Sequence, residues 1–387
     1  MSFRLTLRHI ESIHEVAPEA WNACSGENNP FLLHQFFSVL EDSGTACPES
    51  GWKPCHLLLS AQPGEQLVAV APMFLKFHSE GEFVFDYSWA DAFERAGGRY
   101  YPKLQGAVPY TPVTGPRYLI RSDQPEPEQL RQLLAQAQLD LCRDLGFSSV
   151  HLTFCSRHEY EQGQLDPRWL GRLGIQFHFE NPGYSDFGDF LARLSARKRK
   201  AIRKERQAAQ ASGLICEALQ GPAIEPEHVD HLFRCYRDTT GRKWGRAALT
   251  RRFFELLVER MGERVVLMVA RRERQLVAAA LNLRGHEALY GRNWGCLEEV
   301  PFLHFELCYY QAIEFAIAHR LARVEAGAQG FHKVARGYLP RLTYSLHRIE
   351  QPEFRALLQR VLDEERQEVL AQLQQFGEEH SPYRREG

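Results

Sequence analysis

The chain has 387 residues and a net charge of -2. This length exceeds one ordinary domain, so two domains are expected. With 44% hydrophobic and 25% charged residues, the composition is globular and excludes wholesale disorder. The balanced charge gives no overall attraction to nucleic acid or membrane, so any such contact must be local. No apolar stretch reaches the ~20 residues of a membrane span, and residues 1–9 lack the apolar core of a signal peptide.

The nine cysteines are scattered along the chain and include no Cys-x-x-Cys pair. An odd number with this spacing argues against a disulfide framework and against a structural zinc site. We therefore expect no metal, and reduced thiols in a cytoplasmic protein.

The first half of the chain predicts a mixture of strands and helices. Strands are expected at 3–10, 55–60, 66–77, 82–85 and 149–154, and helices at 30–41, 88–96 and 126–145. A loop rich in Pro, Gly and Tyr is expected at 100–117.

The second half repeats a similar order of elements. Helices are expected at 186–211, 225–239, 246–261 and 303–319, strands at 214–219, 264–271, 275–284, 287–294, 321–325 and 342–349, and a last helix at 352–376. We therefore predict an α/β (α+β) fold built from two copies of one domain, each with a meander of antiparallel strands flanked by helices. The predicted division is 1–165, 166–350, and a C-terminal helix and tail at 351–387, with the boundary in the Gly- and Pro-containing region 160–185.

The segment 325–340 has a composition that suits neither a helix nor a strand. It places an acid, an amide, an imidazole, a lysine and an arginine around three glycines, which let a ligand approach the main chain closely. Lys333 and Arg336 are three residues apart, on one side of any helical turn, so both can meet one phosphate or carboxylate. This composition predicts a functional site.

The stretch 193–206 carries eight basic residues and one acid. A solvated charged face is the usual explanation of such a stretch. Here the excess of positive charge is larger than solubility requires, so we predict a face that binds phosphate, pyrophosphate or an RNA backbone. The best candidates share one helical face: Lys200, Arg203 and Lys204.

The motif at 290–295 places Arg292 and Trp294 between two glycines at the end of a predicted strand. It predicts the lip of a site, and a bulged strand with a packed tryptophan is the alternative.

His304 and Glu306 open the predicted helix at 303–319. His304 is a candidate base, or a structural residue at a helix start. A metal held by His304, Glu306 and His332 is not favoured, because no compact ligand spacing is present.

The loop 100–117 combines aromatic side chains, hydroxyl groups and two cations, with four prolines that fix its shape. Tyr101, Lys103 and Arg117 are its candidates for substrate binding, since a rigid loop loses little entropy on binding. A well-packed connecting loop is the alternative.

Four runs of sequence together resemble a known family. They are Glu325-Ala-Gly-Ala-Gln-Gly-x-His-Lys-x-Ala-Arg-Gly-Tyr-x-Pro340, Tyr290-Gly-Arg-x-Trp-Gly295, His304-Phe-Glu-x-Cys-Tyr-Tyr-Gln311, and Tyr100-Tyr-Pro-Lys-Leu104 with Pro109-Tyr-Thr-Pro-Val-Thr-Gly-Pro-Arg117. They look like the bacterial Fem-like predicted N-acyltransferases, a family labelled for peptidoglycan biosynthesis or recognition. The chain departs from the pattern at Phe331, where an acid is expected.

The resemblance implies two acyltransferase domains of the GNAT type in tandem. The better-known Fem peptidyltransferases move an amino acid from aminoacyl-tRNA to an amine of a peptidoglycan precursor, but this chain lacks their long helical arm. The connection at 295–304 is acidic and lacks the glycine pattern that binds the pyrophosphate of acyl-CoA in GNAT enzymes, which disfavours simple acetyl-CoA use.

We therefore expect an enzyme, an N-acyltransferase that forms an amide between an activated acyl or aminoacyl donor and an amine, with a peptidoglycan precursor as candidate acceptor. No cofactor is required, the donor being acyl-CoA or aminoacyl-tRNA. The expected partners are an anionic small molecule or cell-wall precursor, and tRNA on the helix at 193–206. The alternatives are a non-catalytic recognition module on the same scaffold and an acyl-CoA-dependent N-acetyltransferase.

The chemistry needs a base for the amine and donors for a tetrahedral oxyanion. Candidate bases are Glu325, His304 and His332, and Gln329 with the glycine-loop amides is the candidate oxyanion stabiliser. The expected substrate-binding residues are Lys333, Arg336, Arg292, Trp294, Glu306, Tyr101, Lys103, Arg117, Lys200, Arg203 and Lys204.

Overall fold

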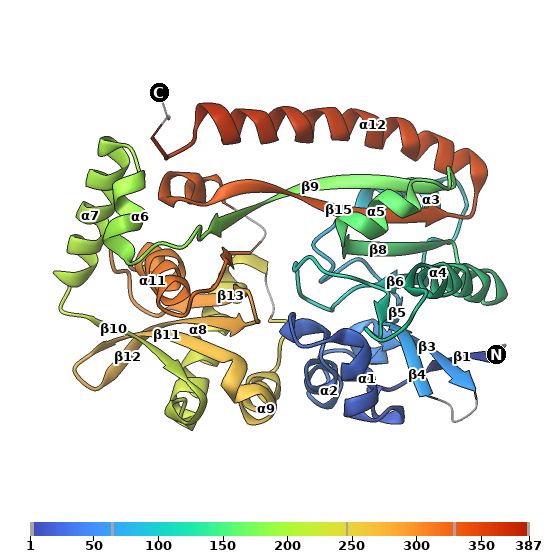
Figure 1. The fold of residues 1–387 in the computed structure, drawn as a ribbon, viewed down its shortest axis with the longest axis horizontal. Helices are drawn as coiled ribbons and strands as arrows, with labels where there is room; N and C mark the ends of the chain where they lie inside the picture. Colours follow the sequence, from blue (N-terminus) through green and yellow to red (C-terminus); the bar gives the residue numbers. More distant parts are fainter. Residues whose placement is uncertain (1–3, 63–65, 245–246, 328–329, 385–387) are drawn as a thin grey trace. The chain divides into compact units, whose positions relative to one another are not determined.

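The computed structural model describes residues 4–62, 66–244, 247–327 and 330–384 (Figure 1). The chain forms two compact units: unit 1 contains Met1–Gly174 and Leu342–Leu370, and unit 2 contains Ile175–Arg341 and Ala371–Gly387. This grouping differs from the expected linear division at 165 and 350, because Leu346 and Ile349 pack in cores of unit 1. The three divisions fall inside strands β9 (Trp169–Glu180) and β15 (Leu339–Ile349) and inside helix α12 (Pro352–Gln374).

Unit 1 contains two groups of strands. One sheet has the order β1-β3-β4-β7, and the strands β15, β8, β6, β5 and β2 follow one another in a second, in which only β6 and β8 pair in parallel. Helix α4 packs on β3, β4 and β8. The strands are β1 (Arg4–Ile10), β2 (Trp52–Pro54), β3 (His56–Gln62), β4 (Gln66–Ala71), β5 (Met73–Lys76), β6 (Lys103–Gly106), β7 (Leu119–Ile120) and β8 (Ser149–Cys155), and the helices are α1 (Pro18–Ser25), α2 (His34–Asp42), α3 (Tyr87–Arg95), α4 (Pro127–Asp144), α5 (Arg157–Gly163) and most of α12 (Pro352–Gln374).

Unit 2 is built on strands in the order β10-β11-β12-β13-β14-β9. Its neighbours are antiparallel except β13 and β14, which run in parallel. Helix α8 packs on β12 and β13, and α11 packs on β13 and β14. The strands are β10 (Ile215–Gln220), β11 (Val265–Arg272), β12 (Gln275–Arg284), β13 (Ala288–Cys296) and β14 (Arg323–Glu325), and the helices are α6 (Phe187–Arg193), α7 (Ala196–Gln210), α8 (Pro226–Trp244), α9 (Arg251–Met261), α10 (Leu303–Phe305), the π-turn η6 (Glu306–Tyr310), α11 (Gln311–Ala318) and the 3-10 segment η7 (Phe331–Arg336).

The predicted fold class is confirmed, since both units combine mostly antiparallel strands with flanking helices. None of the helices in the described part of the chain is long and apolar enough to cross a membrane.

Several predicted elements differ from the structure. The expected strand 66–77 is two strands of different sheets, β4 and β5, and the expected loop 100–117 contains β6. The expected strand 82–85 does not form, because Phe83 has a φ of 61°, in the left-handed region that a strand excludes. The expected helix 186–211 is two helices, since buried Leu194 is extended (ψ 155°) and bridges Tyr383. The expected boundary region 160–185 contains β9, whose Ile175, Phe177 and Phe179 alternate into the core of unit 2.

Gly295 of β13 packs directly on the backbone of α8. A Cβ added there would lie 2.4 Å from the carbonyl oxygen of Cys235, and backbone cannot move aside as a side-chain tip can. We expect Gly295→Ala to lower the free energy of unfolding by about 1–3 kcal/mol, measured as a drop in apparent Tm.

Gly241→Ala on α8 is the matched control. A Cβ at Gly241 would meet nothing within 4 Å, so helix propensity alone should raise stability by about 0.5–1 kcal/mol. Equal effects of the two substitutions would contradict the packing of β13 on α8.

Candidate functional site

Strands β13 and β14 separate after a short parallel pairing, which we call the fork. Residues Ala288–Tyr290 pair with Arg323–Glu325, and β13 then continues to Cys296 on β12 alone. From Gly291 onward, β13 has no strand partner on its β14 side among the described residues. An open strand edge offers backbone donors and acceptors to an extended ligand.

Glu325 ends β14 at the fork and is only 4% exposed. Its Oε1 accepts a hydrogen bond from Arg323 Nε at 2.9 Å, whereas its Oε2 has no hydrogen-bond partner among the described residues. His178 Nε2 lies 3.9 Å from that oxygen, but burial lowers the pKa of His178 to about 3, so its ring is neutral. Burial also raises the pKa of Glu325. This carboxyl group is therefore suited to accept a proton near neutral pH.

A pocket of about 700 Å³ opens at the end of β13. Trp294 and His304, both predicted site residues, form part of its wall, and their rings are 5.2 Å apart. Its formally charged lining residues are three acids, Asp238, Glu298 and Glu299, and one base, Arg242. The remaining lining residues are Thr239, Cys296, Leu297, Val300, Pro301 and Leu303.

The two predicted imidazoles lie close together beside this pocket. The ring centroids of His304 and His332 are 6.0 Å apart. His332 Nε2 lies 2.8 Å from the hydroxyl of Tyr309, which the π-turn η6 places there; such turns are frequent at functional sites. Burial, with Arg336 and Lys333, lowers the pKa of His332. Gln329 lies outside the described residues.

Lys333 and Arg336 brace the glycine loop internally. The Lys333 ammonium donates to the carbonyl oxygens of Ala326 and Gly327 at 2.7 and 2.8 Å, and burial lowers its pKa to about 8. The Arg336 guanidinium donates two hydrogen bonds to Glu205, at 3.1 and 2.8 Å, and its plane covers the ring of Phe305. Anion binding by this pair stays a prediction that these internal partners do not favour.

Arg292 and Glu306 complete the predicted set in unit 2. Arg292 follows the fork on β13, and burial lowers its pKa to about 10. Glu306 is 2% exposed and accepts hydrogen bonds from Arg206 at 3.0 and 2.8 Å and from Gln311 at 2.8 Å. Its carboxylate thus anchors α7 rather than facing a ligand.

Helix α7 divides its charges between two faces. The predicted residues Lys200, Arg203 and Lys204 are exposed. Glu205 and Arg206 face inward to Arg336 and Glu306. The basic face is therefore accessible, as predicted, and its partner stays a prediction.

The loop 100–117 of unit 1 is buried more than expected. Lys103 and Arg117 are 0% and 1% exposed, so neither cation lines an open surface. Arg117 donates to the carbonyl oxygens of Val113, Gly115, Pro116 and Thr153. The expected open position of these cations is therefore wrong. Arg117 is buried because three carbonyl groups of its own loop and one of β8 satisfy its guanidinium.

Tyr101 is half-buried, and its hydroxyl lies 2.7 Å from Ser79 Oγ. Lys103 forms ion pairs with Glu82 and Asp86. Neither carboxylate is among the predicted site residues. A signal was present in the sequence, since polar residues alternate with apolar ones in the strands beside them.

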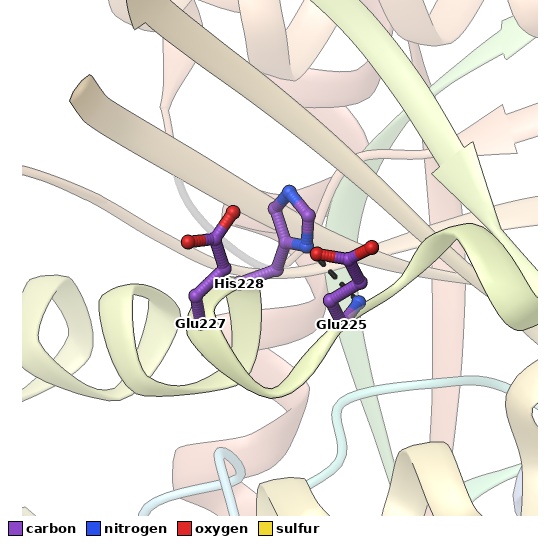
Figure 2. A group of neighbouring side chains, drawn as sticks. All are labelled: Glu225, Glu227 and His228. Atoms are coloured by element: carbon purple, nitrogen blue, oxygen red, sulfur yellow. Dashed lines mark hydrogen bonds between the residues drawn. The ribbon is translucent and has the colours of Figure 1, made fainter. Parts of the chain in front are cut away.

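Glu225, Glu227 and His228 place three potential metal ligands within 4.8 Å of one another at the start of α8 (Figure 2). Both carboxylates are exposed, and His228 Nδ1 accepts a hydrogen bond from the Glu225 backbone at 3.0 Å. This is how a side chain caps a helix start, so capping accounts for the cluster.

Solved structures share this fold at low sequence identity. FemX aligns over 92% of this chain and 100% of its own, with a TM-score of 0.55 and 10% identity. L-PGS from Bacillus licheniformis aligns over 87% of this chain and 98% of its own, with a TM-score of 0.50 and 12% identity. The C-terminal domain of a putative lysylphosphatidylglycerol synthetase from Agrobacterium fabrum aligns over 91% of this chain and 97% of its own, with a TM-score of 0.52 and 10% identity. These likenesses cover both units and confirm the predicted tandem fold.

No curated protein matches the sequence. A family model does match, over residues 12–385, and its description is FemAB-like, peptidoglycan biosynthesis or recognition. Because this match covers nearly the whole sequence, the chain belongs to the FemAB-like family.

Proposed function

We propose that the protein is an N-acyltransferase whose reaction takes place at the fork of unit 2. The observation that carries the proposal is Glu325, a buried carboxyl group whose Oε2 has no hydrogen-bond partner among the described residues, placed where the pairing of β14 with β13 ends. A base with a raised pKa beside the backbone amides of a strand end is an arrangement that suits amide formation.

In the proposed reaction, Glu325 removes a proton from the acceptor ammonium. The amine nitrogen then attacks the carbonyl carbon of the donor ester or thioester. Backbone amides at the fork stabilise the tetrahedral oxyanion. As the bond to the donor oxygen or sulfur breaks, the second proton of the attacking nitrogen passes to that atom, which leaves as an alcohol or thiol, and an amide remains. His304 and His332 are the alternative bases, since both lie beside the pocket.

We propose an aminoacyl donor in preference to acyl-CoA. The pocket at the end of β13 carries three acids, Asp238, Glu298 and Glu299, against one arginine, Arg242, and this net negative charge disfavours the phosphates of CoA. The names of the similar structures FemX and lysylphosphatidylglycerol synthetase support an aminoacyl transfer, and the family description supports a cell-wall precursor as acceptor. All nine cysteines are free, which supports the cytoplasm as the compartment.

An aminoacyl-tRNA donor gives the exposed face of α7 a partner. We expect Lys200→Ala, Arg203→Ala and Lys204→Ala combined to weaken tRNA binding about 10-fold or more and to make the slope of log affinity against log salt less steep by about 2–3, because each lost phosphate contact contributes about one unit. Fluorescence anisotropy with labelled tRNA measures both. Arg143→Ala, an exposed arginine of α4 in unit 1, is the control and should change neither; an unchanged slope in the triple variant would remove α7 from the proposal.

The reaction itself is tested with a matrix of donors and acceptors. The donors are aminoacyl-tRNA, acetyl-CoA and longer acyl-CoAs, and the acceptors are nucleotide-linked peptidoglycan precursors and simple primary amines. Mass spectrometry detects the amide product. Product from aminoacyl-tRNA supports the proposal, product from acyl-CoA alone shows the N-acetyltransferase alternative, and no product from any pair contradicts an enzyme acting on these classes.

A recognition module is the second candidate, because the family description includes recognition. In that case a precursor should raise the Tm by mass action with no turnover of any donor.

A further inference from the structure

One face of the second sheet in unit 1 is polar although it is buried. Strands β6, β8 and β15 alternate apolar and polar residues, and the apolar set, including Leu104, Val150 and Leu346, packs in the core. The opposite set is polar, and its members are neighbours in register across β5, β6, β8 and β15. This polar face consists of Lys76, Lys103, Gln105, His151, Thr153 and His347, none more than 1% exposed.

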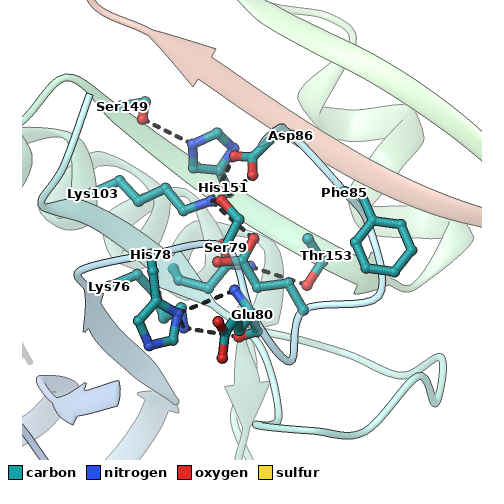
Figure 3. A network of polar contacts seen from close by, with 12 residues as sticks. Lys76, His78, Ser79, Glu80, Phe85, Asp86, Lys103, Ser149, His151 and Thr153 are labelled. Atoms are coloured by element: carbon teal, nitrogen blue, oxygen red, sulfur yellow. Dashed lines mark hydrogen bonds and ion pairs between the residues drawn. The ribbon is translucent and has the colours of Figure 1, made fainter. Parts of the chain in front are cut away.

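The segment 79–87 covers the polar face with acids (Figure 3). Lys103 Nζ lies 2.5 Å from Asp86 Oδ2, 2.8 Å from Glu82 Oε2 and 3.2 Å from Ser79 Oγ. Tyr100 donates to Asp86 at 2.6 Å. In Figure 3, Lys103, Ser79, Asp86 and His151 converge, whereas Phe85 points away from them. The ammonium of Lys103 thus has all three of its hydrogen bonds within the protein.

Three polar atoms at this face have no partner among the described residues: Glu82 Oε1, Gln105 Oε1 and His347 Nε2. A buried polar atom without a partner costs about 1–3 kcal/mol, and apolar side chains of the same volume are often at least as stable as a buried ion network. The polar face therefore makes the fold less stable than an apolar face of the same volume would, which is typical of functional sites. Two of the three atoms are oxygens that need a hydrogen-bond donor.

Aromatic side chains border the polar face, where the entrance proposed below lies. The half-buried Tyr101 joins Ser79 through its hydroxyl. Tyr87 is 48% exposed, and its pKa is raised by burial and by the nearby carboxylates of Glu80 and Glu82. Phe85 stacks on Tyr87 with centroids 5.9 Å apart.

The backbone of the covering segment is strained. Phe83 has a φ of 61° and a 38% exposed side chain. A bulky residue in the left-handed region costs of order 1–3 kcal/mol and is typical of functional segments.

The formal charges of Lys76, Lys103, Glu82 and Asp86 cancel, and the group left for a further cation is the second carboxyl oxygen of Glu82. Lys103 bonds both acids but leaves Glu82 Oε1 free. Lys76 is directed elsewhere, since its ammonium lies 3.8 Å from the Trp52 ring centroid and donates to the Glu80 carbonyl oxygen at 3.0 Å. An ammonium group supplies three donors and a positive charge, and aromatic faces attract it.

We propose that the polar face of unit 1 binds a primary ammonium group, held by Glu82 and Gln105 and entered past Tyr87 and Tyr101. The inference rests on unit 1 alone and does not require the transferase reaction. The ligand class is a primary amine carried by a small molecule or a peptide side chain.

Three five-carbon probes of different charge test the proposal on the full chain. Isothermal titration in an amine-free buffer compares 1,5-diaminopentane, 1,5-pentanediol and glutarate. We expect the diamine to bind at least 10-fold more tightly than the diol, and glutarate not to bind. Equal binding of diamine and diol, preference for glutarate, or no binding of the diamine would each overturn the proposal.

Substitutions locate the binding. Glu82→Gln keeps the shape and removes the charge, and should weaken diamine binding 10-fold or more. Tyr101→Phe removes one hydroxyl at the mouth and should weaken it about 2–5-fold. Glu11→Gln removes an exposed carboxylate of unit 1 that pairs with Lys53 and should have no effect. If Glu82→Gln does not fold, Tyr101→Phe and the ranking of the three probes decide; binding unchanged in Tyr101→Phe would then overturn the assigned mouth.

Discussion

Replacing Lys103 with methionine should lower the free energy of unfolding by about 3–5 kcal/mol, which is the usual cost of removing one partner from a buried ion pair. Methionine fills nearly the same space, so the loss is one of charge. Without the ammonium, Glu82 and Asp86 remain buried, at 3% and 1% exposure, with no group that bonds both. Urea unfolding of the full chain measures the change.

The cost should depend on pH through Asp86. Burial alone would raise the pKa of Asp86, but Lys103 outweighs it and holds the pKa below the ordinary 3.8. A carboxyl pKa lowered by folding contributes stability above the unfolded pKa, and this contribution is lost as the pH falls through the folded value. Lys103→Met removes it and leaves burial to raise the pKa of both carboxyl groups, as it already raises that of Glu82 to about 7. The deficit should therefore be smallest near about pH 3 and grow as the pH rises through about 5 to 7.

A surface pair of the same length is the control for this substitution. Lys53 and Glu11 are also 2.8 Å apart, but their side chains are 29% and 60% exposed. Lys53→Met should therefore cost no more than about 1 kcal/mol. If both substitutions lower the free energy of unfolding equally, the buried ion pairs of Lys103 are no stronger than a solvated pair. That result would contradict a buried, ionised network at the polar face.

Periodicity predicted most of the helices and strands, because alternation and helical spacing are local properties of the sequence. It failed where one residue had an unusual backbone. Phe83 in a left-handed conformation prevents a strand, and the extended Leu194 divides a helix whose spacing continues through it. The glycines of β9 concealed a strand whose apolar alternation, at Ile175, Phe177 and Phe179, was present.

The residues of the candidate site could be predicted from the sequence, but the partners with which they form hydrogen bonds and ion pairs could not. The sequence indicated that the segment 325–340 and the imidazoles belong together, and the structure brings His304 and His332 within 6.0 Å. It could not indicate that Arg336 pairs with Glu205, 131 residues away. A charge visible in the sequence is available to a ligand only when no distant residue neutralises it, and that depends on tertiary structure.

Replacing Glu325 with glutamine should lower turnover by about 10²–10⁴-fold, the usual contribution of a general base. Glutamine has the same shape but cannot accept the proton of the acceptor amine. KM should change little, because a base that acts in the transition state contributes little to ground-state binding. The measurement uses the donor and acceptor pair that yields product in the matrix described above, with Tm as a check on folding.

Glu287→Gln is the matched control for this base, since Glu287 also lies beside Arg323, at 3.5 Å, but is 63% exposed. Glu287→Gln removes one carboxylate beside Arg323 and leaves Glu325 in place, so turnover should persist. If Glu325→Gln retains turnover, the proton must leave through His304 or His332. Burial lowers the pKa of His332 and raises the pKa of Glu325. The two candidate bases thus move toward each other in pKa, so substitution of each group, rather than the pH profile, separates the carboxylate from the imidazole.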